Sequence, residues 1–240
     1  MSADTPQHAN MPPPRRGLMR SGLVVSAMTM LSRVMGLVRD VVVATFLGAG
    51  NGSDAFFVAF KIPNFLRRLF AEGAFSQAFV PVLASFSEQA DHESVGLFVS
   101  RIFSHLVLVL VIVVAVAEVL APALIMLFAP GFLQDPERFM WAVHMLRVTF
   151  PYILLISLTA MSAAVLNTYQ RFALPAFVPV FLNLALIWAG WSWSPHFSVP
   201  VYALSWGVLL GGLLQLSLQL PVLWRLGLLP RFTLDWRDPK

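Results

Sequence analysis

The chain has 240 residues, of which 58% are hydrophobic and only 12% are charged, and its mean hydropathy is +0.76. Soluble globular proteins carry about 25% charged residues, so this composition excludes a soluble globule and predicts an all-α, polytopic membrane protein. The 16 basic and 12 acidic residues form no clustered basic face, which argues against a nucleic-acid partner. With no cysteine and no paired histidine spacing, we expect no disulfide, metal site or cofactor.

The chain begins with a polar, proline-rich segment. Residues 1–20 are expected to form a disordered cytoplasmic tail. Arg15 and Arg16 precede an apolar run, as the basic residues of a signal peptide do. However, Arg33 interrupts that run and no clear cleavage site of small residues follows it. The first apolar run is therefore expected to be an uncleaved transmembrane span.

Six apolar helical stretches follow, each long enough to provide the ~20 residues that cross the hydrocarbon core of a bilayer. They are expected at 21–47, 53–86, 102–121, 139–166, 172–191 and 199–224. The second is longer than one crossing requires, with bends expected at Pro63, Gly73 and Pro81. Residues 121–132 are apolar but are broken by two prolines and a glycine, which favours an interfacial segment.

An even number of spans places both termini on one side of the membrane, and basic residues mark the cytoplasmic side. The terminal side holds Arg15, Arg16, Arg20, Arg101, Arg171, Arg225, Arg231, Arg237 and Lys240. The opposite loops hold only Arg138 clearly. Both termini are therefore expected in the cytoplasm, with a six-helix transmembrane lobe at 21–228 and a cytoplasmic tail or linker at 229–240.

Charged residues interrupt the first two spans between Ser32 and Gly73. They are Arg33, Arg39, Asp40, Asp54, Lys61, Arg67, Arg68 and Glu72. A charge at the bilayer centre costs about 2.5–3.5 kcal/mol on insertion scales, so these side chains should face protein or water. On an ideal helix Arg33 and Asp40 share a face, and Arg39 lies about 120° away. The first span should therefore carry a broad polar flank.

Two interpretations of these charges remain open. In the structural one, Asp54 caps the second span, Lys61 snorkels, and Asp40 neutralises a neighbouring arginine. Arg68 and Glu72 then form an ion pair four residues apart. In the functional one, the arginines line a water-filled cavity and hold an anionic ligand, because guanidinium stays charged and its forked donors match phosphate oxygens. Asp54 would then form a gate pair or a cation site near the outer end.

Several stretches of the sequence form a distinctive pattern, among them MTMLSRVMGLVRD (28–40), SDAFFVAFKIPNFLRRLFAEGAFSQAFVPVL (53–83) and LNTYQRFALPAF (166–177). In these stretches the sequence resembles the MurJ/MviN family, the lipid II flippases of bacterial peptidoglycan synthesis. The resemblance implies a MATE-like fold of the MOP superfamily, in which two lobes enclose a cationic cavity and work by alternating access. The implied partners are lipid II, membrane lipids and a second lobe that this chain does not contain.

The resemblance also implies residue roles. Arg33, Arg39 and Arg67 match the family's functional arginines and would bind the substrate diphosphate, and Asp54 would take part in gating. The secondary candidates are Asp40, Lys61, Arg68 and Glu72. The chain is then expected to be the N-terminal lobe of a lipid II flippase in the bacterial cytoplasmic membrane, and not an enzyme.

Three alternatives use the same residues differently. Another MOP-type exporter would share the fold, although an exporter of cationic drugs should have acidic residues in its cavity. A non-transporting membrane scaffold would account for the missing second lobe. An enzyme acting on polyprenyl phosphates would need clustered acids for magnesium or a nucleophile and base pair, and neither spacing occurs in the sequence.

Overall fold

The computed structural model describes residues 15–48, 50–67 and 75–233, and all regular elements in these ranges are helical. They are α1 (Arg15–Leu47), α2 (Asn51–Arg67), α3 (Phe75–Gln89), α4 (His92–Phe128), η2 (Pro130–Gln134), α5 (Pro136–Thr149), α6 (Tyr152–Thr168), α7 (Ala173–Phe177), α8 (Pro179–Trp188), η3 (Ala189–Trp193), η4 (Ser194–His196) and α9 (Tyr202–Arg225). This confirms the all-α class. Helix α1 already begins at Arg15, within the segment expected to be a tail.

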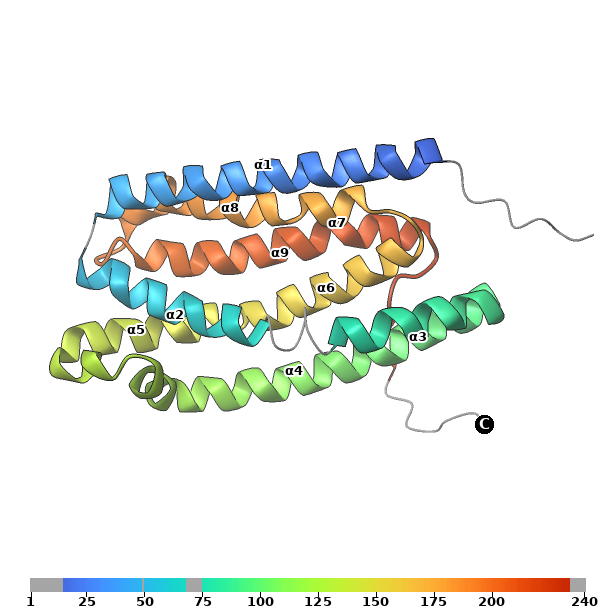
Figure 1. Ribbon diagram of the computed structural model, residues 1–240. Helices are drawn as coiled ribbons and strands as arrows, with labels where there is room; N and C mark the ends of the chain where they lie inside the picture. Colours follow the sequence, from blue (N-terminus) through green and yellow to red (C-terminus); the bar gives the residue numbers. More distant parts are fainter. Residues whose placement is uncertain (1–14, 49, 68–74, 234–240) are drawn as a thin grey trace, which may run out of the picture.

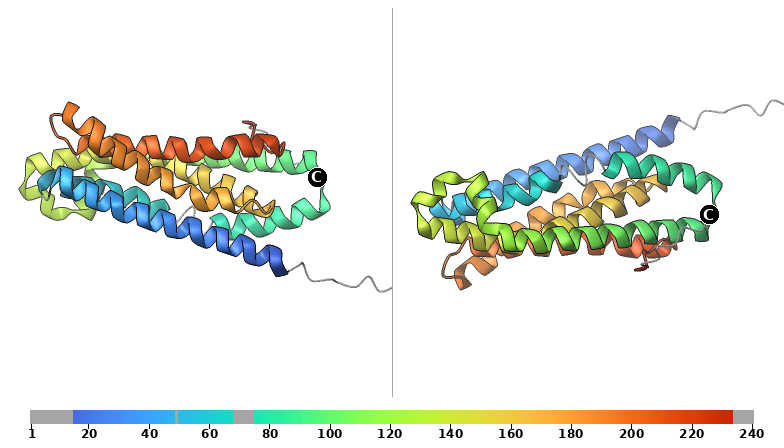
Figure 2. Two further views of the ribbon diagram at one scale, coloured as in Figure 1. Left: turned by 90° about the horizontal axis from the view of Figure 1, so that it is seen from above. Right: turned by 90° about the horizontal axis from the view of Figure 1, so that it is seen from below.

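The long helices lie side by side in one elongated bundle (Figures 1 and 2). Within the described residues, five stretches are long and apolar enough to cross a membrane: 22–45, 92–128, 136–168, 173–196 and 202–225. The expected second span is divided between α2 and α3, with residues 68–74 outside the described ranges. Because α2 starts at one end of the bundle and α3 finishes at the other, the pair runs the length of the bundle (Figure 1).

Helix α4 corrects the expectation of an interfacial segment at 121–132, because it continues through Pro122 to Phe128. A proline inside a helix has no N–H, so the carbonyl four residues earlier, that of Glu118, loses its helical partner. The Nε of Arg147 on α5 donates to this carbonyl over 3.3 Å. A donor from a neighbouring helix thus satisfies the freed backbone group, as a helix in lipid requires.

Helix α9 lies close to its neighbours because it carries small residues at its contacts. A Cβ on Gly207 would lie 2.7 Å from Ala189 Cβ, and one on Gly211 would lie 2.7 Å from Leu182 Cδ1. On the adjoining face, a Cβ on Gly212 would lie 2.8 Å from Tyr152 Cδ2. The glycines therefore allow α8 and α6 to pack directly on α9, as small residues at a helix contact do.

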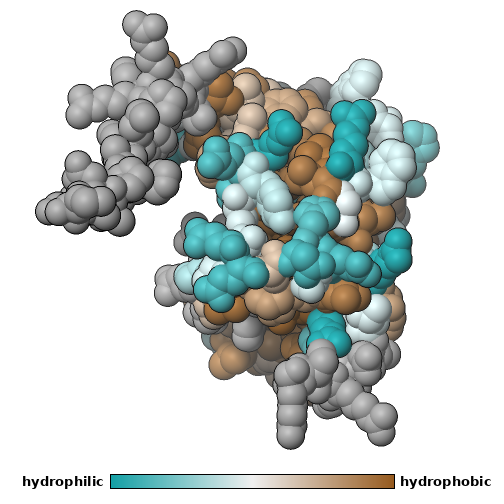
Figure 3. Space-filling view, turned by 90° about the vertical axis from the view of Figure 1, so that its right-hand side faces the viewer, coloured by the Kyte–Doolittle hydropathy of each residue, from teal (hydrophilic) through white to brown (hydrophobic). Residues whose placement is uncertain are grey.

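One end of the bundle is rich in hydrophilic side chains (Figure 3). This end holds the start of α1, the turn between α3 and α4 and the end of α9 (Figure 1). His92, Glu93 and Arg225 are exposed there. Helix α1 therefore begins, and helix α9 ends, on the same side of the bundle, as an even number of crossings requires.

The substitution Gly211→Ala should destabilise the lobe, because its Cβ would also meet the backbone of Leu182 at 3.0 Å. We expect the free energy of unfolding to fall by about 1–3 kcal/mol, the usual effect of overpacking. Gly22→Ala on α1 is the matched control, since a Cβ there meets no atom within 4 Å. Thermal unfolding of the purified protein in detergent compares the two variants, and equal melting temperatures would contradict this packing.

Candidate functional site

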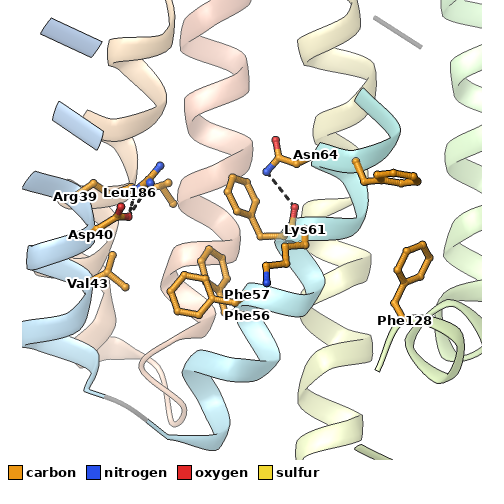
Figure 4. A pocket seen from close by; sticks show the side chains of 11 residues that line it. Arg39, Asp40, Val43, Phe56, Phe57, Lys61, Asn64, Phe128 and Leu186 are labelled. Atoms are coloured by element: carbon orange, nitrogen blue, oxygen red, sulfur yellow. Dashed lines mark hydrogen bonds and ion pairs between the residues drawn. The ribbon is translucent and has the colours of Figure 1, made fainter. Parts of the chain in front are cut away.

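A cavity of about 710 Å³ opens beside the charged parts of α1 and α2. Its polar lining residues are Arg39, Asp40, Lys61 and Asn64, and its aromatic ones are Phe56, Phe57, Phe60, Phe65 and Phe128. Figure 4 shows Arg39 and Asp40 on α1, Lys61 on α2, and the rings of Phe56 and Phe57 between them. The cavity therefore combines cationic groups with an aromatic wall inside an otherwise apolar bundle.

Arg39 is the most fully engaged of the charged residues in this cavity. Its Nε and Nη2 donate to Oδ1 of Asp40 over 3.0 and 2.7 Å. Its Nη1 donates to Oδ1 of Asn183 on α8 over 2.9 Å. The Arg39 side chain is 24% exposed, whereas that of Asp40 is 61% exposed. The guanidinium is thus held against α8, while its carboxylate partner remains open to the cavity.

These bonds show the expected neutralisation of an arginine by Asp40. A guanidinium has five N–H groups, and the three bonds leave two of them without a partner among the described residues. Chemically, Arg39 is therefore a fixed cation with donors still available. An oxyanion that entered the cavity could accept hydrogen bonds from those donors or displace the exposed carboxylate.

Arg33 occupies a different position from Arg39. Its side chain is exposed and lines a shallow depression formed by α1 alone, with Val25, Ser26, Thr29 and Met30. Arg39 and Lys61 line one cavity together, so the structure brings these two predicted residues together and leaves Arg33 apart. Arg67 is the last residue of α2, and its side chain lies outside the described residues. Arg68 and Glu72 lie entirely outside them.

Asp54 pairs with Arg138 across the end of the bundle that carries the turn between α1 and α2. Nη2 of Arg138 donates to Oδ2 of Asp54, and the guanidinium lies 4.2 Å from the ring centroid of Phe132. Beside this pair, Nδ2 of Asn51 donates to Oδ2 of Asp135 over 3.0 Å. Two contacts therefore join the start of α2 to the start of α5.

Sequence reasoning missed two partners, Asn183 and Arg138. Asn183 interrupts the apolar run PVFLNLALIW, and a lone amide in such a run was the available signal. Arg138 was noted only as a base on the outer side. Within the described ranges, no cluster of three His, Asp or Glu residues could hold a metal ion.

Comparison with known proteins places these features in a family. A sequence model of the lipid II flippase MurJ family matches residues 43–240. Lipid II flippase MurJ of Burkholderia cenocepacia is 47% identical over 91% of this chain and 42% of that protein. The probable lipid II flippase MurJ of Vibrio cholerae is 45% identical, over 92% of this chain and 44% of that protein.

A solved structure of lipid II flippase MurJ in an inward closed conformation superposes with a TM-score of 0.71. It is 29% identical in sequence, and the match covers 89% of this chain and 43% of that one. The chain therefore spans less than half the length of the relatives it matches. Within that length, the likeness extends over nearly all of the helical bundle.

The pair formed by Asp54 and Arg138 should show energetic coupling in a double-mutant cycle. Because Asp54 is exposed, we expect a coupling of about 0.5–1 kcal/mol between Asp54→Asn and Arg138→Gln in thermal unfolding. Glu137→Gln is the matched control, since Glu137 is a charged residue in the same turn of α5 as Arg138. Its effect should add to that of Asp54→Asn within about 0.3 kcal/mol. Additivity of the first pair would refute the contact.

Proposed function

The chain belongs to the lipid II flippase MurJ family, and on that premise we propose that it forms the N-terminal lobe of a lipid II flippase. With a second lobe, it moves the undecaprenyl-diphosphate-linked peptidoglycan precursor across the bacterial cytoplasmic membrane. The named relatives are flippases of lipid II, and they support this assignment. The five long apolar helices support a location in the membrane.

The proposal assigns Arg33, Arg39 and Arg67 to the substrate diphosphate. The observation that carries it is the guanidinium of Arg39, which lines a cavity of about 710 Å³ and retains two N–H groups for a ligand. Arginine suits this task because its planar donors match phosphate oxygens and its charge persists at every physiological pH. Lys61 lines the same cavity and adds a second cation beside the ligand.

Asp40 acts in this proposal as an internal counter-ion. In the absence of ligand, its carboxylate accepts two bonds from Arg39 and so offsets the desolvation of the cation. The carboxylate is exposed to the cavity, so a diphosphate can replace it without opening the helical core. Replacement exchanges one anion for another at the same guanidinium, so Arg39 stays paired, and Lys61 in the same cavity offers a second cation for the additional negative charge of the diphosphate.

Asp54 belongs in this proposal to the outer gate. Its contact with Arg138 joins α2 to α5 at the end of the bundle opposite the start of α1, and Asn51 with Asp135 reinforces the junction. A junction of this kind stabilises one arrangement of the outer end and must open when the lobe rearranges. The hydrophilic end that carries the start of α1 and the end of α9 then faces the cytoplasm, in agreement with the positive-inside rule (Figure 3).

Neutral substitution of the three arginines tests the proposal in the two-lobe transporter. Arg33→Gln, Arg39→Gln and Arg67→Gln, introduced one at a time, should each abolish the growth of cells depleted of their native flippase, because each removes a cation for the diphosphate. Membrane insertion and expression are measured in parallel. Arg171→Gln is the control, since Arg171 is an exposed arginine outside the cavity. Normal growth of all three variants would refute the assignment.

A further inference from the structure

Helix α1 is held to the rest of the lobe along one side only. It packs chiefly against α7, α8 and η3. Among its residues with described side chains, Val43 alone is buried. The rotation of a helix about its own axis sets where its arginines point, and for α1 it is set by the contacts along this one side. The contacts between α1 and α8 therefore determine how Arg39 is presented to the cavity.

Asn183 is the polar centre of that contact. It lies in the middle of α8, is only 6% exposed, and is absent from the lining of the Arg39 cavity. Its Oδ1 accepts from Nη1 of Arg39 over 2.9 Å, while its Nδ2 donates to the carbonyl of Ser32 over 3.2 Å. One buried amide thus contacts both the arginine and the backbone of α1 about two turns earlier.

We propose that Asn183 is a positioning residue, which orients Arg39 and fixes the rotation of α1 so that the guanidinium faces the diphosphate. This inference rests on the proposed function, because it assumes that Arg39 binds the ligand. Asn183 acts through Arg39 and does not touch the substrate, since it is not among the residues that line the cavity.

The chemistry of an amide suits this role better than that of a carboxylate. Its carbonyl oxygen accepts a hydrogen bond from the guanidinium without neutralising it, so the full positive charge remains available to the ligand. Asp40 does the opposite, because its carboxylate offsets the charge of Arg39. When a diphosphate displaces Asp40, the bond from Asn183 remains and keeps the guanidinium in place.

The bond to Ser32 adds a second constraint. The carbonyl of Ser32 lies within α1, where helical geometry already gives it a partner four residues later. The amide therefore provides an additional bond that holds α1 against α8.

The substitution Asn183→Leu tests the inference in the two-lobe transporter. Leucine keeps a similar volume and suits an apolar helix, so the protein should still insert and fold. We expect lipid II to bind about tenfold more weakly, which corresponds to the loss of one hydrogen bond to a charged group. Gln215→Leu is the matched control, because Gln215 is a buried amide on α9 that bonds Tyr152 and the carbonyl of Val178. It should leave lipid II affinity unchanged.

A double-mutant cycle separates positioning from a general structural effect. If Asn183 acts through Arg39, Asn183→Leu should not weaken lipid II binding further when Arg39→Gln is already present. An equal loss of affinity in both backgrounds would overturn the inference, as would unchanged affinity of Asn183→Leu alone. If Arg39→Gln itself binds lipid II normally, the proposed function fails as well, so the two failures are distinguishable.

The substitution Asn183→Asp provides a second, independent test. Aspartate keeps nearly the same shape and an acceptor for Arg39 but lacks the donor to the Ser32 carbonyl, so thermal stability in detergent should fall no further than in Asn183→Leu, which lacks the same donor. Its carboxylate would neutralise the guanidinium, and lipid II affinity should therefore fall despite the intact fold. Parental affinity in this variant would contradict the role assigned to the neutral amide.

Discussion

The constraint on which this structure depends is that a guanidinium placed among apolar helices must have hydrogen-bond partners. Arg39 meets it through a carboxylate on its own helix and an amide on α8. Without them, the desolvation of a permanent cation would threaten insertion of α1. The same partners fix the position of α1, because the amide also bonds the Ser32 carbonyl. One hydrogen-bond network therefore offsets the desolvation of Arg39 and defines one wall of the cavity.

The rest of the lobe follows the same rule. Pro122 frees the carbonyl of Glu118, and Arg147 from the next helix donates to it, so α4 continues without a break. Elsewhere in the bundle, the glycines of α9 let α6 and α8 approach α9 closely. The resulting close packing supports α8, the helix that carries Asn183. Helix α8, which holds Arg39 at the cavity wall, is thus itself closely packed against α9.

The sequence was sufficient to predict features that depend on local pattern. Helix class, the approximate spans and the polar flank of α1 follow from hydropathy and from helical periodicity. The partners of the charges could not be predicted in this way. Arg39 and Asn183 are 144 residues apart, and Asp54 and Arg138 are 84 apart. Such pairs depend on the rotation and depth of each helix in the bundle, which a single sequence does not specify.

Helix α4 illustrates the same limit. Pro122, Pro130 and Gly131 predict a break when they are considered alone, and α4 does end before Pro130. It continues through Pro122, where an arginine 29 residues from Glu118 donates to the carbonyl that the proline leaves free. By contrast, the separation of Arg33 from Arg39 agrees with their offset of about 120° on an ideal helix, whereas the partner of Arg39 on α8 could not be derived from that spacing.

Site-specific photo-crosslinking to lipid II tests the central claim most directly. A photoreactive amino acid replaces Phe57, which lines the cavity and is 45% exposed, in the two-lobe transporter. The control position is Val119, which is 77% exposed on α4 and lies outside the cavity lining. We predict that labelled lipid II attaches at position 57 but not at 119, and that Arg39→Gln removes most of the signal. Equal labelling at both positions, or labelling at 57 that is independent of Arg39, would contradict the account.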